Sequence, residues 1–314
     1  MQGFLFDGID YIETLAHLGR PTTVPNLKTA VLMRTIRNSR HVDALGPWPY
    51  GSAPEAETLP EAFAALKSMG AVSFTGMLRP DAALDPAAAR RVGAAAVPLK
   101  DHFIADGDRG RPALSPKTRR NLAIAERHWS VAVATPALDL VESAATLHLD
   151  LQKRRHLSTM TRMPPGHFQR LIHLPGVAVL TARDGAGTGA MLIAAHGADE
   201  THLLHLLVDR RALRTCAAHL LMASAVELWG SHRRVYLGGT PDGPDGPGIA
   251  RFKARWANRT SPVWLLTAIL HREAYAELSR RAPGSGYFPI YRNPGVRTEA
   301  PGPERHMAME DRSA

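Results

Sequence analysis

Lysine is rare in this chain, and one lysine lies beside an aromatic residue in a basic segment. Only six of the 38 cationic side chains are lysines, and Lys253 follows Phe252 in the basic segment RFKARW. A cation beside a reacting carbonyl stabilises the negative charge that develops on its oxygen during acyl transfer. The alternative is a solvated charge on a short helix whose core stripe is Phe252 and Trp256, four residues apart. From the residues alone a solvated charge is the favoured interpretation, and Lys253 and Phe252 become candidate catalytic residues through the resemblance given below.

A loop rich in glycine and proline precedes this segment. It runs from Gly238 to Gly248 with five glycines and three prolines, and it lacks the G-K-S/T ending of a phosphate-binding loop. We expect Gly238 and Gly239 to line a donor site with backbone, and a simple surface turn is the alternative. Tyr236, on the strand before the loop, is a candidate catalytic proton or hydrogen-bond donor. Asp242 is a candidate for orienting an incoming amine.

Clustered cations are candidates for binding phosphate, because guanidinium groups bind phosphate oxygens in pairs. The alternatives are solvated helix faces and cations placed at helix C-termini. Arg154, at the end of a long helix, is a candidate for contacting acidic groups of an acceptor. Trp48 and Tyr50 could stack on an acceptor base or sugar, or could fill a hydrophobic corner. The candidate donor-binding cations are Lys117, Arg119, Arg120, Arg210, Arg211, Arg214, Arg251 and Arg255.

Other chemistries find little support in the sequence. The 15 histidines include no H-E-x-x-H motif, and His202 and His205 are expected on opposite faces of one strand. We therefore expect no metal. No G-x-S-x-G elbow is present. Cys216 is the only cysteine; at a helix start it could be a thiol of lowered pKa, although small buried cysteines are more common.

Composition and charge describe a globular protein with a polyanionic partner. The chain has 314 residues, 45% of them hydrophobic, and a formal net charge of +9. That charge suits a phosphate-rich partner, and coding bias toward alanine and arginine is the alternative. No apolar run is long enough to span a bilayer, and no signal peptide is recognisable. We expect a cytoplasmic location.

These candidates need elements to position them, and the periodicity predicts an α/β arrangement. In the first half the pattern predicts a helix from Leu59 that ends at Gly70, and a polar linker covers 106–121. Ser115 before Pro116 marks a helix start there. The predicted strands of this half begin at Lys28, Ala71 and Ala94, and 43–54 is expected to be a loop.

The second half is predicted to run strand, two helices, three antiparallel strands, helix, strand, helix, strand. The predicted strands begin at His128, Val177, Gly189, Thr201, Arg233 and Ser261, and the predicted helices begin at Leu138, His167 and Cys216 and near Phe252.

This order, together with four segments, resembles the acetyltransferase (GNAT) fold and in particular its FemAB-like branch. The segments are SPKTRRNLAIAERHW, the hairpin region LPGVAVLTARDGAGTGAMLIAAHGADETHLLHLL, YLGGTPDGPDGPGIARFKARW and GYFPIYR. The resemblance implies an α+β (α/β) fold of tandem GNAT-like domains, with mixed, mostly antiparallel sheets flanked by helices. It implies a first domain over 1–114 that 282–300 return to complete, and a second domain over 115–281. We expect 301–314 to be a disordered tail.

The resemblance also implies an activity. Fem-type proteins transfer an aminoacyl group from aminoacyl-tRNA to an amine, and the lysine that matches Lys253 is thought to assist the reacting ester. The implied co-substrate is aminoacyl-tRNA, the acceptor is a small amine-bearing molecule or peptide, and no further cofactor is expected.

The turn VDRRALRTCAAH helps to decide between aminoacyl-tRNA and acyl-CoA as the donor. Acyl-CoA users of this fold place glycines between the central strand and its helix, so that backbone amides approach the pyrophosphate. Residues 212–216 contain no glycine, which disfavours acetyl-CoA or another acyl-CoA. An acyl-CoA-dependent N-acyltransferase remains the first alternative. A non-catalytic, basic RNA-binding protein on the same scaffold is the second.

Overall fold

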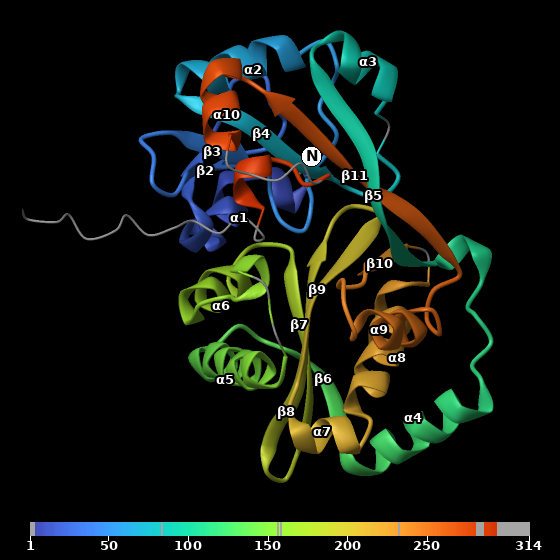
Figure 1. Cartoon of the computed structure of the whole chain (residues 1–314). Coiled ribbons are helices and arrows are strands. Elements are labelled where there is room, and N and C mark those ends of the chain that lie inside the picture. Colours follow the sequence, from blue (N-terminus) through green and yellow to red (C-terminus); the bar gives the residue numbers. More distant parts are fainter. Residues whose placement is uncertain are drawn as a thin grey trace, which may run out of the picture. The chain divides into compact units, whose positions relative to one another are not determined.

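The computed structural model describes residues 4–82, 84–155, 157, 159–231, 233–280 and 286–293. The chain divides into two compact units, Met1–His271 and Arg272–Ala314. The larger unit holds every strand of the part described, and these strands form one sheet (Figure 1).

That sheet has eleven strands in the order β1-β2-β3-β4-β11-β5-β10-β9-β8-β7-β6. Two neighbouring pairs, β3 with β4 and β9 with β10, are parallel, and the other pairs of the order are antiparallel. The strands are β1 Arg20–Thr22, β2 Val31–Thr35, β3 Val42–Leu45, β4 Ala71–Leu78, β5 Ala94–Asp106, β6 Ser130–Ala134, β7 Val177–Asp184, β8 Gly187–His196, β9 Glu200–Val208, β10 Arg234–Gly238 and β11 Arg259–Ile269.

Helices cover both faces of the sheet. In the second half α5 and α6 lie on one face, whereas α4, α8 and α9 lie on the other (Figure 1). Their apolar faces supply the separate core clusters of the two sides. The α-helices of this unit are α1 Ile9–Thr14, α2 Leu59–Ser68, α3 Pro86–Arg91, α4 Pro116–His128, α5 Leu138–Arg154, α6 Pro165–Ile172, α7 Arg210–Arg214, α8 Ala217–Trp229 and α9 Gly246–Lys253, and the 3-10 turns are η1 Leu5–Asp7, η2 Ala16–Leu18, η3 Gly107–Arg109 and η4 Thr159–Thr161.

Most predicted elements are present. The Ser115 hydroxyl accepts a hydrogen bond from the Thr118 amide at 3.2 Å and caps α4, as its sequence position predicts. Three local predictions were wrong. Residues 43–45 belong to β3 instead of a loop, α7 precedes α8, and α9 begins at Gly246 inside the predicted glycine loop.

The two halves share the sheet through long strands. β11, which the sequence assigns to the second half, pairs with β4 over Trp264–Ile269 and with β5 over Arg259–Ala268. β5 also pairs with β10. The predicted division between residues 114 and 115 stays a prediction.

β9 and β10 pair over a short stretch only. Glu200, Thr201 and His202 face Arg234, Val235 and Tyr236, after which β9 continues to Val208 while β10 ends at Gly238. No described strand lies between β9 and β5 beyond the end of β10.

The expectation that His202 and His205 lie on opposite faces was wrong. The register of β8 against β9 shifts between Ile193 and Ala194, so that β9 carries an extra residue, Leu204. A bulge of one residue returns the following side chains to the same face. His202 and His205 both contact the cluster on the α5–α6 face.

In the second unit, α10 (Arg272–Ser279) and η5 (Ile290–Arg292) are described. Tyr275 stacks on Phe288 at 5.7 Å and contacts Tyr291 edge-on. The predicted return of 282–300 to the first domain stays a prediction, and 281–285 and 294–314, with the predicted tail, lie outside the described residues. Among the described helices, none has the length and hydropathy needed to cross a bilayer.

A substitution at Leu266 tests the placement of β11 in the shared sheet. Leu266 lies on β11 between β4 and β5 and is fully buried. Leu266→Ala should lower the free energy of unfolding by about 2–5 kcal/mol, because it leaves a cavity. Leu228→Ala on α8, where the side chain is 52% exposed, should change it by less than about 0.5 kcal/mol. Equal denaturant midpoints for the two variants would contradict the placement of β11.

Candidate functional site

The Lys253 side chain reaches the residues that follow β10. Lys253 is the last residue of α9, and its Nζ donates a hydrogen bond to the Gly239 carbonyl at 2.6 Å. Burial, and then the nearby charge of Lys100, lowers the pKa of Lys253 to about 8. The Lys253 ammonium is therefore held against backbone in a largely desolvated position.

The glycine pair makes room for two side chains. Gly238 has a φ of +79°, and a Cβ there would lie 3.1 Å from Lys253 Nζ. A Cβ on Gly239 would lie 2.7 Å from His102 Cδ2. Glycine is needed at 238 for the left-handed backbone and at 239 for the close approach of an imidazole.

Lys100 and His102 complete this cluster, and sequence reasoning missed both. Because β10 ends opposite Phe103, these two residues of β5 extend beyond it. Lys100 Nζ donates to the Thr240 carbonyl at 3.2 Å. Burial and the two lysines lower the pKa of His102 to about 3, and its Nδ1 has no partner among the described residues. Three successive polar residues, Lys100, Asp101 and His102, within an otherwise largely apolar strand were the signal that could have revealed them.

Tyr236 does not join this cluster. Val235 and Leu237 pack in the core cluster that includes Phe252, so Tyr236 faces the opposite side of β10. It is fully buried, and its hydroxyl donates to Asp81 Oδ2 at 3.1 Å. Its predicted catalytic role therefore has no support from the geometry, and a structural role fits better.

A charged network surrounds Asp81. The Arg259 guanidinium binds both Asp81 oxygens, at 2.9 and 2.6 Å, and its Nε donates to Asp106 Oδ2 at 3.0 Å. Hydrogen bonding by Arg259 holds the pKa of Asp81 well below its usual range. Arg234 lies 3.8 Å from the same carboxylate.

A second set of buried polar groups lies beside it. Glu200 is paired with Arg79 and lies 3.2 Å from His202 Nε2. His202 stacks on Tyr236 with ring centroids 4.5 Å apart. The Tyr50 hydroxyl lies 2.7 Å from His202 Nδ1. These contacts connect the 46–51 loop of the first half with β9 and β10.

The burial of Tyr50 corrects one prediction. Tyr50 is 2% exposed, so its ring cannot stack on an incoming base or sugar. Burial also raises its pKa well above the usual value. Trp48 is half-buried and packs against the same core cluster. The alternative, in which both rings fill a hydrophobic corner, is the better description.

Most predicted donor-binding cations are exposed. They lie on α4, α7 and α9 or beside them, and α4 and α9 share a face of the sheet (Figure 1). Arg211 is an exception, because it pairs with Asp184 and lies over the Trp129 ring. The exposed members are Lys117, Arg119, Arg120, Arg210, Arg214 and Arg251, and Arg255 is half-buried.

The glycine-poor turn already uses its own amides. The Asp209 carboxylate accepts from the Ala212 amide at 2.6 Å, and the Asp209 carbonyl accepts from Leu213. The amides of Thr215 and Cys216 donate to the Arg211 and Leu213 carbonyls. A pyrophosphate at this turn would meet a carboxylate and occupied amides.

Two buried nitrogen atoms near α9 lack partners in the part of the chain that is described. His219 Nε2 lies 3.0 Å from Asn121 Nδ2, so that atom accepts and the proton of the neutral ring is on Nδ1. Nδ1 of His219 and Nε1 of Trp256 have no acceptor. The His219 and Trp256 rings lie 6.1 Å apart, and Phe252 packs edge-on against His219. Phe252 thus packs beside two N–H donors, of His219 and Trp256, that lack acceptors among the described residues.

Arg154, Asp242 and Cys216 are the remaining candidates. Arg154 donates to Asp150 and to the Val208 carbonyl, so its guanidinium is engaged within the fold. Asp242 is fully exposed, 4.0 Å from Lys100 Nζ. Burial raises the pKa of Cys216, so the thiol is not activated. Among the described residues no group of three or more histidine, cysteine or acidic side chains could hold a metal ion.

Comparison with known proteins identifies the fold. No family model and no curated protein matches the chain. The solved structures include FemX, with a TM-score of 0.64 at 10% identity over 87% of this chain and 94% of that one.

Two further structures share the fold. The C-terminal domain of a protein named as a lysylphosphatidylglycerol synthetase from Agrobacterium fabrum has a TM-score of 0.57 at 14% identity, covering 83% of this chain and 87% of that one. L-PGS from Bacillus licheniformis has a TM-score of 0.55 at 12% identity, covering 85% and 94%. The Fem-like GNAT fold that the sequence predicts is confirmed.

The Asp81 network predicts a pH dependence of stability. Burial raises the pKa of Glu200, but its contacts with His202 and Arg79 outweigh this, so its pKa, like that of Asp81, lies below the usual value. Both carboxylates therefore stabilise the fold above about pH 4, and this contribution is lost as the pH falls toward their folded values.

Asp81→Asn should unfold more easily at neutral pH and lose less stability than the parent between about pH 4 and pH 2. Chemical denaturation across this range measures the effect. Asp108→Asn, at an exposed carboxylate, is the matched control. Parallel pH profiles for Asp81→Asn and the parent would argue against this role of the network.

Proposed function

We propose that the protein transfers an aminoacyl group from aminoacyl-tRNA to a small amine-bearing acceptor or peptide and forms an amide. The observation that carries the proposal is the position of Lys253, whose Nζ is held 2.6 Å from the Gly239 carbonyl beside a glycine pair. The fold shared with FemX and L-PGS supports a transferase.

The reaction needs positioning and charge stabilisation. The acceptor nitrogen attacks the ester carbonyl, a C–N bond forms, and the C–O bond to the tRNA ribose breaks. The amine loses one proton, and the ribose oxygen that leaves takes up one proton. The ester is already activated, so no other energy source is required. The Lys253 ammonium is the group proposed to stabilise the oxyanion, and desolvation strengthens its effect.

The turn before α8 favours aminoacyl-tRNA over acyl-CoA. A CoA pyrophosphate binds free amides at a helix N-terminus, and here those of residues 212, 213, 215 and 216 have partners within the chain. The exposed cations of α4 and α9 and the nearby Arg210 and Arg214 suit a longer polyanion, whose binding gains from counterion release. A tRNA donor is also consistent with the cytoplasmic location proposed from the sequence.

Donor binding tests this choice. We expect fluorescent aminoacyl-tRNA to bind more tightly than uncharged tRNA, with a preference that persists when salt is raised, because the aminoacyl group is recognised near Lys253. Affinity for both forms should fall steeply with salt. Saturable binding of acetyl-CoA without this preference would favour the acyl-CoA alternative. Equal binding of both tRNA forms, with no amide product, would favour the RNA-binding alternative.

Lys253 variants test the chemistry. Lys253→Ala should lower kcat for transfer by about 10²–10³-fold, the usual cost of removing one oxyanion donor. Lys67→Ala, at an exposed lysine on α2, is the matched control and should keep parental turnover. Full activity of Lys253→Ala would rule out this role.

The same residue predicts a pH effect. Lys253 is charged below its pKa of about 8, so transfer that needs the cation should decline as the pH rises through this value. Arginine stays charged throughout this range, so Lys253→Arg should lack the alkaline decline even if its kcat is lower. Steady-state rates across this range measure both profiles.

A further inference from the structure

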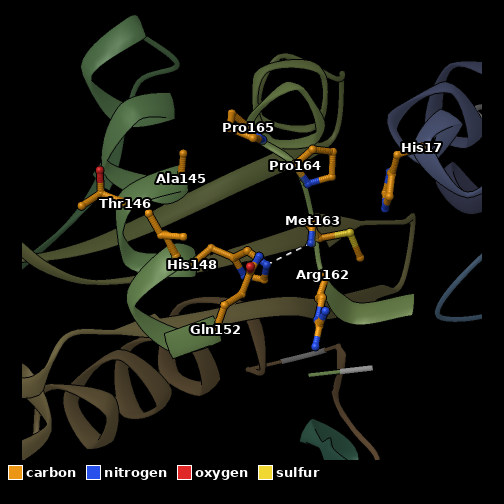
Figure 2. A pocket seen from close by; sticks show the side chains of 10 residues that line it. His17, Ala145, Thr146, His148, Gln152, Arg162, Met163, Pro164 and Pro165 are labelled. Carbon is orange, nitrogen blue, oxygen red and sulfur yellow. Dashed lines mark hydrogen bonds between the residues drawn. The ribbon is translucent and has the colours of Figure 1, made fainter. Parts of the chain in front are cut away.

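A cavity of about 450 Å³ lies on the face of the sheet opposite α9. Its wall is formed by α5, by the segment that leads into α6, and by His17 of η2 (Figure 2). Its volume is in the range of small-molecule sites. None of the proposed transfer residues lines it, so it is a separate feature of the molecule.

The wall combines apolar surface with positive polarity. Leu149, Met163 and Pro164 are among its apolar members, and Leu149 is 51% exposed. Arg162 is the one permanently charged side chain among the described residues of the lining, which include no Asp or Glu. Such a wall favours a ligand with an apolar body and a negative group.

His148 adds a buried hydrogen-bond donor. It is 3% exposed, and its Nε2 accepts a hydrogen bond from the Met163 amide at 3.0 Å (Figure 2). Burial lowers the pKa of His148, so the ring is neutral and its proton is on Nδ1. Nδ1 has no partner among the described residues. A buried donor without an acceptor is costly, and a bound oxygen atom would remove that cost.

We propose that this cavity binds a small carboxylate with an apolar tail. The carboxylate accepts from His148 Nδ1 and pairs with Arg162, and the tail covers Leu149 and Met163. The inference does not depend on the donor of the transfer reaction, because it uses none of the residues assigned to transfer.

Hexanoate and its neutral isostere hexanamide are suitable probes. By calorimetry the full chain should bind hexanoate at least tenfold more tightly than hexanamide, because a charged acceptor forms the stronger hydrogen bonds. In ¹⁵N spectra the His148 Nδ1–H signal should shift on addition of hexanoate. If hexanoate binds no better than hexanamide, or if neither binds, the proposal fails.

Variants separate the two contacts from general effects. Arg162→Gln should weaken hexanoate binding about tenfold and leave hexanamide unaffected. Arg170→Gln, at an exposed arginine of α6 outside the lining, is the matched control and should bind like the parent. Equal affinities in the two variants would overturn the role of Arg162. His148→Phe should lose the preference for hexanoate over hexanamide. If this variant does not fold, the ¹⁵N titration of the parent still tests the role of Nδ1.

Discussion

The site depends on the bidentate pairing of Asp81 with Arg259. Asp81 follows β4, and Arg259 begins β11, so the pair ties the end of one half to the strand that returns from the other. A bidentate arginine–carboxylate pair fixes the orientation of both partners as well as stabilising them. Tyr236 and Arg234 approach the same carboxylate, so the pair also fixes β10, and with it the glycine pair at the end of β10.

The early end of β10 brings groups from both faces of the sheet together. Beyond Gly238 no described strand separates β9 from β5. Gly239 and the Lys253 charge approach His102 from the side of α9. Tyr50 approaches the same imidazole from the 46–51 loop, with ring centroids 5.5 Å apart. A β10 as long as β9 would have kept these groups apart.

The sequence predicted what depends on local pattern. Hydrophobic periodicity and the Ser115 cap predicted most strands and helices, and the resemblance of the Phe252–Lys253 segment to Fem-type proteins pointed to Lys253. It could not predict what depends on distant pairing. The positions of Lys100 and His102 follow from the register of β5 against β10, and the common face of His202 and His205 follows from a bulge set by β8. The burial of Tyr50 likewise depends on His202, 152 residues away.

Two buried imidazoles on opposite faces of the sheet each have one ring nitrogen without a hydrogen-bond partner among the described residues. His148 is paired at one nitrogen and open at the other, and His219 shows the same arrangement on the opposite face. In each ring the paired nitrogen accepts, so the proton is on the open nitrogen and the ring offers a donor. Buried donors are normally satisfied within a fold. Of the two rings, His148 also lines a cavity beside Arg162 and apolar side chains, and there a ligand that supplies an oxygen acceptor would satisfy the open donor.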